Sequence, residues 1–207
     1  MANETPWQTT GPFFHFGLAW SGGADLVSDS ELGARLDLTA TGHDLLVRHG
    51  ATDRNLTKGT RIEIAGSMFD NRGEPFTDAL IEIWQADAEG RYGQGADPHF
   101  LGFGRCATDK TGSYRFRTIR PGRVKGPGNS LQAPHIALGL VGPGILKRLV
   151  TRIYFADAGE NAEDPILSLV PEERRSTLIA QKEPGANNTY RFDIRLGAER
   201  ETVFFDF

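Results

Sequence analysis

One histidine stands in an apolar run where a pair of histidines could bind a metal ion. The run extends from Pro134 to Val141, is predicted to be a buried strand, and contains His135. Residues two apart on a strand point to the same side, so a two-histidine site would need its second imidazole at position 137. That position is alanine, Ala137. The segment 132–137 therefore has the framework of a metal site with one expected ligand missing.

The five histidines show no other ligand pattern. None is placed in an H-x-H, H-x-x-x-H or H-E-x-x-H spacing, so the sequence predicts no metal site. They are His15, His43, His49, His99 and His135. Two interpretations of His135 stay open from the residues alone. It is either a hydrogen-bonded core histidine or one ligand of a two-histidine, one-carboxylate site assembled from distant segments.

Nucleophile and phosphate-binding motifs are also missing. The single cysteine, Cys106, excludes an internal disulfide and indicates a reducing compartment. No acid or base motif surrounds it, which favours a small buried hydrophobic side chain over a nucleophile. The sequence contains no G-x-S-x-G, and no lysine or helix follows Gly102-Phe103-Gly104. A serine hydrolase and a phosphate loop are therefore not expected.

Composition predicts a single cytoplasmic domain without nucleic-acid or membrane partners. The 207 residues include 39% hydrophobic residues, enough to build a core. With a net charge of -4 and no basic stripe, nucleic acid is an unexpected partner. The apolar runs are far shorter than the roughly 20 residues that a spanning helix needs. The segment 1–6 lacks the basic and apolar regions of a secretory signal.

The elements that must position these residues are predicted to be mostly strands. The 25 glycines and 11 prolines separate short apolar runs, a pattern typical of an all-β sandwich or barrel. The predicted strands are 61–69, 79–86, 113–119, 134–141, 149–155 and 190–196. One helix is predicted over 171–180, because proline and two glutamates begin it and Pro184-Gly185 follows it.

Both ends of the chain are rich in aromatic residues. Segment 204–207 contains three phenylalanines, and segment 12–16 contains three more. Chain ends are usually polar and frayed, and burying three phenylalanines contributes at most about 5–9 kcal/mol. We expect these ends to be buried, either in the chain's own core or under a partner chain.

The order of motifs along nearly the whole chain resembles the intradiol ring-cleaving dioxygenases. The motifs are Thr5-Pro6, Gln8-Thr9, Gly11-Pro12, 81–87 (IEIWQAD), Asp97-Pro98, Phe100, Gly104-Arg105, 118–122 (TIRPG), 133–136 (APHI), 151–155 (TRIYF), 190–194 (YRFDI) and 201–206 (ETVFFD). The segments 133–136 and 201–206 are similar to the alpha-type chains of two-chain members. The resemblance implies an all-β fold with a β-sandwich core, long loops and one or two short helices. It implies one domain over 1–207, with an N-terminal arm and surface excursion over 1–58 and a core with C-terminal tail over 59–207.

In this family a catalytic chain binds one ferric iron through two tyrosines and two histidines. Dioxygen opens the catechol ring between its two hydroxyl carbons, and the alpha-type resemblance implies protocatechuate as substrate and 3-carboxy-cis,cis-muconate as product. On this chain the ligand tyrosine falls on Val124, the histidine pair falls on His135 and Ala137, and an arginine falls on Gln132. We call these four the vestigial positions. The other ligand tyrosine belongs to a loop that is shortened here, between Tyr92 and Asp97.

The resemblance therefore implies no catalytic residue and no metal on this chain. Fe(III) would be bound by an iron-bearing beta-type partner chain, and this chain would shape the partner's pocket. The implied substrate-pocket wall is Thr9, Thr10, Gly11, Pro12 and Phe13, although the same segment could serve only as an interface strap. Gly11 would let backbone approach the substrate, and Thr9 could donate a hydroxyl bond.

One substrate-binding charge that the resemblance implies is missing from this chain. Alpha-type chains have an arginine near the substrate's carboxylate where this chain has Pro143. The partner chain, Arg123, Lys125 or Lys147 would have to replace that charge. Two other functions compete with the partner-chain hypothesis. One is a stand-alone dioxygenase with an unusual metal set, such as His135 and His99 with a carboxylate, and the other is a non-enzymatic β-sandwich module for binding or assembly.

Overall fold

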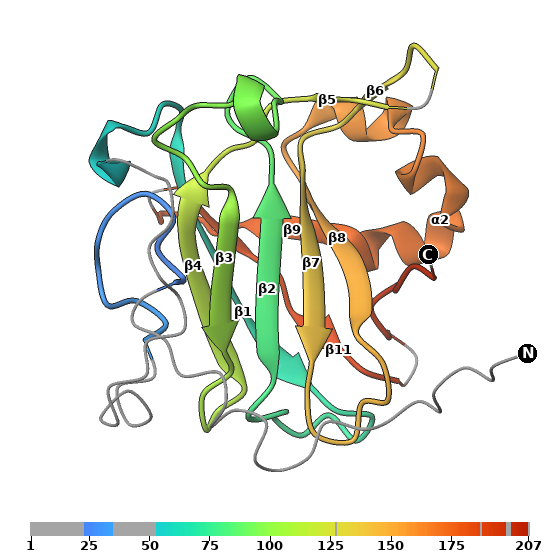
Figure 1. The fold of residues 1–207 in the computed structure, drawn as a ribbon. Helices are drawn as coiled ribbons and strands as arrows, with labels where there is room; N and C mark the ends of the chain where they lie inside the picture. The colour runs from blue at the N-terminus through green and yellow to red at the C-terminus, as the bar shows by residue number, and fades with distance from the viewer. Residues whose placement is uncertain (1–22, 35–52, 127, 187, 198–199, 207) are drawn as a thin grey trace, which may run out of the picture.

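The all-β prediction is confirmed. The structure is a computed structural model that describes residues 23–34, 53–126, 128–186, 188–197 and 200–206 (Figure 1). Its strands are β1 Arg61–Phe69, β2 Leu80–Gln85, β3 Phe103–Ala107, β4 Ser113–Ile119, β5 Val124–Lys125, β6 Leu131–Gln132, β7 His135–Val141, β8 Leu149–Phe155, β9 Ile179–Lys182, β10 Thr189–Arg191 and β11 Ile194–Arg195. The helical segments described are α2 Glu172–Arg175 and the short 3-10 turns η2 Arg54–Leu56, η3 Gly93–Gly95, η4 Gly159–Glu163, η5 Leu167–Leu169 and η6 Ser176–Leu178.

Nine strands form one sheet that curls over itself into two layers. Its order is β11-β1-β10-β9-β8-β7-β2-β3, and β4 pairs antiparallel with β1. Strands β3, β2, β7 and β8 lie side by side in Figure 1, with β1 behind them. Strand β9 connects the layers, because it runs parallel to β8 and antiparallel to β10. The hairpin β5–β6 stands apart at one end of the sheet (Figure 1).

The core lies between the layers and follows from the period-two pattern of the strands. On β1 the inward residues Ile62, Ile64 and Met68 are 5%, 0% and 0% exposed, whereas the alternate positions 63, 65, 67 and 69 are only half-buried. They belong to one hydrophobic cluster with Ile81 of β2 and Phe116 of β4. Alternation along each strand therefore predicts which side chains fill the sandwich.

The predicted helix over 171–180 is wrong beyond its first turn. The α-helix ends at Arg175, a 3-10 turn follows, and strand β9 begins at Ile179. Ile179 and Ala180 pair with Tyr154 and Phe155 of β8, and Ala180 is fully buried. Strand pairing and burial therefore outweigh the local helix preference.

The predicted strand over 190–196 is interrupted. Phe192 and Ile194 are buried as the alternation predicts, but β10 ends at Arg191 and β11 begins at Ile194. The Asp193 carboxylate accepts the backbone N–H of Ser67 at 3.0 Å. A side chain thus replaces a backbone carbonyl in the pairing with β1, which divides the strand.

The C-terminal tail packs on its own chain. Phe204 packs on the main core, and Phe205 packs on a second cluster made by Ala133, Tyr154, Leu167, Val170 and Leu178. The backbone N–H of Phe205 donates to the carbonyl of Val150 at 2.8 Å. Both rings stay half-buried, so the tail is only partly covered by its own fold. Phe207 and segment 12–16 lie outside the described residues.

Two smaller expectations also have an outcome. Cys106 is 6% exposed, and burial raises the pKa of its thiol, as expected for a small buried side chain. Across the part of the chain that the structure describes, no helix is both long enough and apolar enough to cross a membrane.

Candidate functional site

The structure brings the four vestigial positions together. On β7, His135 and Ala137 lie opposite Tyr154 and Arg152 of β8, so all four belong to one face of the sheet. In the hairpin β5–β6, Val124 lies opposite Gln132. The Arg152 guanidinium connects the two groups, because its Nη1 donates to Gln132 Oε1 at 2.6 Å.

Arg152 stands at the centre of this cluster. Its Nη1 is 3.5 Å from the Tyr154 hydroxyl oxygen. Burial raises the pKa of Tyr92 and of Tyr154, and the positive charge of Arg152 opposes that rise in both. The same charge helps to lower the pKa of His135. A fixed cation therefore acts on the three titratable rings of the cluster, Tyr92, Tyr154 and His135.

His135 is a hydrogen-bonded core histidine. The side chain is 4% exposed, and Nδ1 lies 2.8 Å from the carbonyl oxygen of Ala133. Since a carbonyl can only accept, Nδ1 donates its proton there. Burial first, and then the Arg152 charge, lower the pKa of His135 below its ordinary value of 6.5. The ring is therefore neutral at neutral pH.

A buried carboxylate positions the start of β7. Asp164 is fully buried, and its oxygens accept from the Ala133 N–H at 2.7 Å and the Tyr154 hydroxyl at 3.0 Å. It also accepts the backbone N–H groups of Ile166 and Leu167 at 2.9 and 2.7 Å. Asp164 is not among the residues that the motifs in the sequence single out. Its signal was the dipeptide Asp164-Pro165, since Asp before Pro favours a turn in which the carboxylate accepts N–H groups two and three residues ahead.

These residues do not fit the ferric iron of the family. Ferric iron favours anionic oxygen ligands, whereas Val124 and Ala137 have no donor atom. The Gln132 oxygen already accepts from Arg152, and the guanidinium repels a second cation placed among these residues. Nor do the described ranges contain any group of three or more His, Cys, Asp or Glu side chains that could hold a metal ion.

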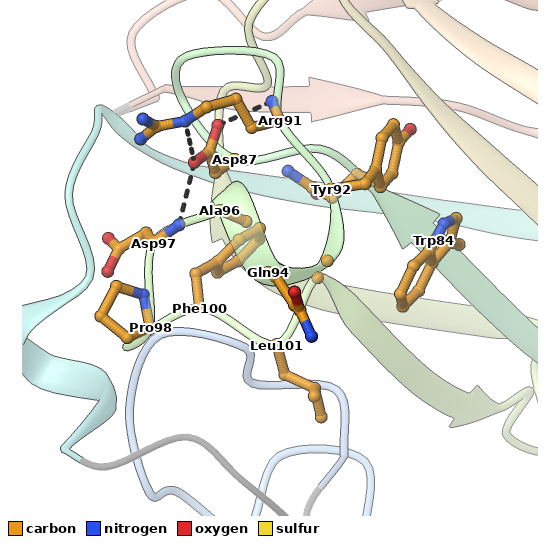
Figure 2. Close-up of a pocket in the computed structure, with 13 residues that line it drawn as sticks. Trp84, Asp87, Arg91, Tyr92, Gln94, Ala96, Asp97, Pro98, Phe100 and Leu101 are labelled. Carbon is orange, nitrogen blue, oxygen red and sulfur yellow. Dashed lines mark hydrogen bonds and ion pairs between the residues drawn. The ribbon is translucent and has the colours of Figure 1, made fainter.

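A pocket of about 360 Å³ lies beside the cluster (Figure 2). Trp84 and Tyr92 stack on one side of it with their ring centroids 5.8 Å apart. Trp84 lies opposite Ala137 across the β2–β7 pairing. Trp84 and Leu101 remain 45% and 41% exposed. The pocket therefore offers a flat aromatic wall next to the vestigial positions.

The loop around this pocket is built on Asp87. Its carboxylate accepts the backbone N–H groups of Arg91 and Asp97, both at 2.9 Å, and the Arg91 Nε at 3.2 Å (Figure 2). This loop is the one to which the resemblance assigns the other ligand tyrosine. Its only tyrosine, Tyr92, faces Trp84 in a stack. The loop thus provides aromatic surface and no second tyrosine.

The other candidate residues are the proposed pocket wall and the three charges that could replace the arginine expected at Pro143. The proposed pocket wall Thr9, Thr10, Gly11, Pro12 and Phe13 lies outside the described residues. Arg123 directly precedes Val124, and its Nη2 is 3.7 Å from Glu163, whereas Lys147 Nζ is 2.7 Å from Asp206. Lys125 is exposed on β5.

Comparison with known proteins shows what the chain is similar to. Residues 36–198 match the model of a family described as Dioxygenase. The chain is 38% identical over 99% of its length to the protocatechuate 3,4-dioxygenase alpha chain of Pseudomonas putida, of which 96% is covered. It is 39% identical over 71% of its length to the protocatechuate 3,4-dioxygenase beta chain of Burkholderia cepacia, of which 72% is covered.

A solved structure shows the same fold. The dioxygenase domain of a dioxygenase and carbohydrate-binding protein fusion from Streptomyces sp. SirexAA-E superposes with a TM-score of 0.59 at 24% identity. The superposition covers 95% of this chain and 99% of that domain. Together with the matches above, these findings show that the chain belongs to the intradiol ring-cleaving dioxygenase family.

Proposed function

We propose that this chain is the alpha, non-iron subunit of a protocatechuate 3,4-dioxygenase and works with an iron-bearing beta subunit. The assembled enzyme cleaves protocatechuate with O2 to 3-carboxy-cis,cis-muconate. Fe(III) is bound by the beta subunit, and this chain alone binds none and is inactive. The full-length similarity to two alpha chains, each at 38% identity, supports this role.

One observation supports the proposal most strongly. It is the group of residues around Arg152, which we call the Arg152 cluster: the four vestigial positions with Tyr92 and Tyr154. The fold that surrounds the family's iron is retained, yet the vestigial positions Val124 and Ala137 have no donor atom. A guanidinium bonded to Gln132 lies among them at 2.6 Å. Because this arrangement is internally hydrogen-bonded, it is stable without a metal ion.

The chain's contribution to catalysis is then to shape its partner's pocket. We assign that role to Thr9, Thr10, Gly11, Pro12 and Phe13 on the basis of the family resemblance. We also assign residues 1–207 to one domain, whose core over 59–207 supports this N-terminal segment. The single buried cysteine supports a location in a reducing compartment such as the cytoplasm.

Co-expression with a beta chain tests the proposal. The isolated chain, the isolated beta chain and the complex are compared for iron content, visible absorption and protocatechuate-dependent oxygen uptake. The complex should contain iron and turn over substrate, whereas the isolated alpha chain should do neither. Turnover by the isolated chain would support a stand-alone dioxygenase. A complex whose iron and activity equal those of the beta chain alone would support a non-enzymatic module.

A variant of the alpha chain tests the alternative that this chain is a stand-alone dioxygenase. His135→Gln removes the single histidine at the vestigial positions and keeps a side chain that can hydrogen-bond to Ala133. The proposal expects the complex to retain its iron and its turnover within about twofold. If the variant complex contained less iron than the wild-type complex, His135 would be an iron ligand.

A further inference from the structure

A second hollow lies away from the Arg152 cluster. Its volume is about 830 Å³, and its walls come from the α2–η6 turn, the β9–β11 strands and the segment 200–202. Figure 1 shows α2 and β11 on the same side of the molecule as the C-terminus. None of the residues that line it belongs to the Arg152 cluster.

Positive charge surrounds this hollow in excess. Among the described residues, four arginines line it against two carboxylates: Arg174, Arg191, Arg195 and Arg200 against Glu173 and Asp193. Arg191 makes an ion pair there with Asp193 at 2.9 Å. Within the described ranges, the other three arginines have no ion-pair partner.

Two of these arginines are held in place by uncharged contacts. Arg174 Nη2 donates to the carbonyl of Glu201 at 2.9 Å, while its buried Nε has no hydrogen-bond partner among the described residues. The Arg195 guanidinium lies 4.6 Å from the centre of the Phe69 ring. These contacts fix the guanidinium groups without neutralising their charge, which is the preorganisation that an anion site needs.

We propose that this hollow binds a small polycarboxylate anion. A guanidinium pairs with a carboxylate through two parallel hydrogen bonds, and a buried N–H without an acceptor is unfavourable until such a group arrives. The arginines come from different elements around a hollow much larger than one phosphate. Several carboxylates on one small molecule therefore match the arrangement better than a single compact anion.

The ring-opening product of the proposed function belongs to this chemical class, since it has three carboxylates. That match rests on the proposed function, but the anion site does not. If the alpha role were disproved by the iron measurements, binding of a polycarboxylate here could still be observed.

Calorimetric titration with citrate tests the site on the full chain. Citrate should bind saturably with one site per chain at fixed ionic strength. The double variant Arg195→Gln/Arg200→Gln should bind at least about tenfold more weakly, because it removes two charge-assisted contacts. Arg72→Gln, at an exposed turn outside the hollow, is the matched control and should bind as the wild type does.

Several results would overturn the inference. They are the absence of saturable citrate binding, a double variant that binds as tightly as the wild type, or inorganic phosphate binding more tightly than citrate. If the double variant fails to fold, Arg200→Gln alone changes an exposed side chain and should weaken binding by about threefold or more. If citrate binding disappeared in the complex with the beta chain, the hollow would bind acidic groups of the partner and not a small anion.

Discussion

Replacing Asp164 with alanine should destabilise the chain more than any exposed carboxylate substitution does. The side chain is fully buried and accepts four hydrogen bonds. Two of them join distant parts of the fold, from the Ala133 N–H and from the Tyr154 hydroxyl. Asp164→Ala would therefore separate the η4–η5 segment from the connection between Gln132 of β6 and His135 of β7.

The expected cost follows from the donors left behind. Each buried donor without a partner costs about 1–3 kcal/mol, which applies to the Ala133 N–H and the Tyr154 hydroxyl. The turn bonds at Ile166 and Leu167 add about 0.5–1.5 kcal/mol each. Removing a buried carboxylate also relieves its own desolvation, and water can enter the space. We expect a net loss of about 3–5 kcal/mol in the free energy of unfolding.

Urea unfolding followed by circular dichroism measures this loss. Asp70→Ala is the matched control, because the Asp70 carboxylate accepts two backbone N–H groups on an exposed turn. It should cost no more than about 1 kcal/mol, since water replaces those contacts. Asp164→Asn, which retains one carbonyl oxygen, should lie between the two. If Asp164→Ala cost no more than Asp70→Ala, the assignment of Asp164 as the anchor of this region would be refuted.

Three further predictions concern the cluster and the tail. Because the folded-state pKa of His135 is below 6.5, the folded chain binds fewer protons than the unfolded chain. This contribution to stability is complete above pH 6.5 and is lost as pH falls towards the folded-state pKa, so His135→Gln should flatten the fall in unfolding free energy between pH 7 and pH 5. An unchanged slope would contradict it. Arg152→Met should raise the pKa of His135 in an NMR titration, and an equal or lower value would show that the guanidinium charge does not act on this ring. Deleting residues 204–207 removes two half-buried phenylalanines worth about 2–4 kcal/mol, so the chain should become insoluble or fail to pair with a beta chain, whereas pairing at full affinity would exclude the tail from this role.

Local pattern was sufficient to predict those elements whose own alternation defines a buried face. Strand β1 was predicted with its observed bounds, because Ile62, Ile64 and Met68 alternate with polar or small residues. Strand β3, by contrast, was not predicted. It contains Gly104 and Arg105, and its strand state depends on pairing with β2 and on the Arg105 bond to Glu82 at 3.1 Å.

The candidate site was likewise predictable only in part from the sequence. The vestigial positions were found from the motif order, because single residues such as Val124 and Ala137 can be compared one by one. The central role of Arg152 was not found. It depends on the register of β7 with β8 and on the contact with Gln132 in the β5–β6 hairpin, and neither is encoded in local spacing.

Metal content is the most direct test of whether this chain has lost the iron site of its family. The isolated chain is incubated with excess ferric iron, freed of unbound metal, and analysed for iron and for visible absorption. We predict a colourless protein without stoichiometric iron, while the complex with a beta chain is coloured and contains iron. A coloured isolated chain with one iron per molecule, able to open catechol rings, would show that the iron site has been kept.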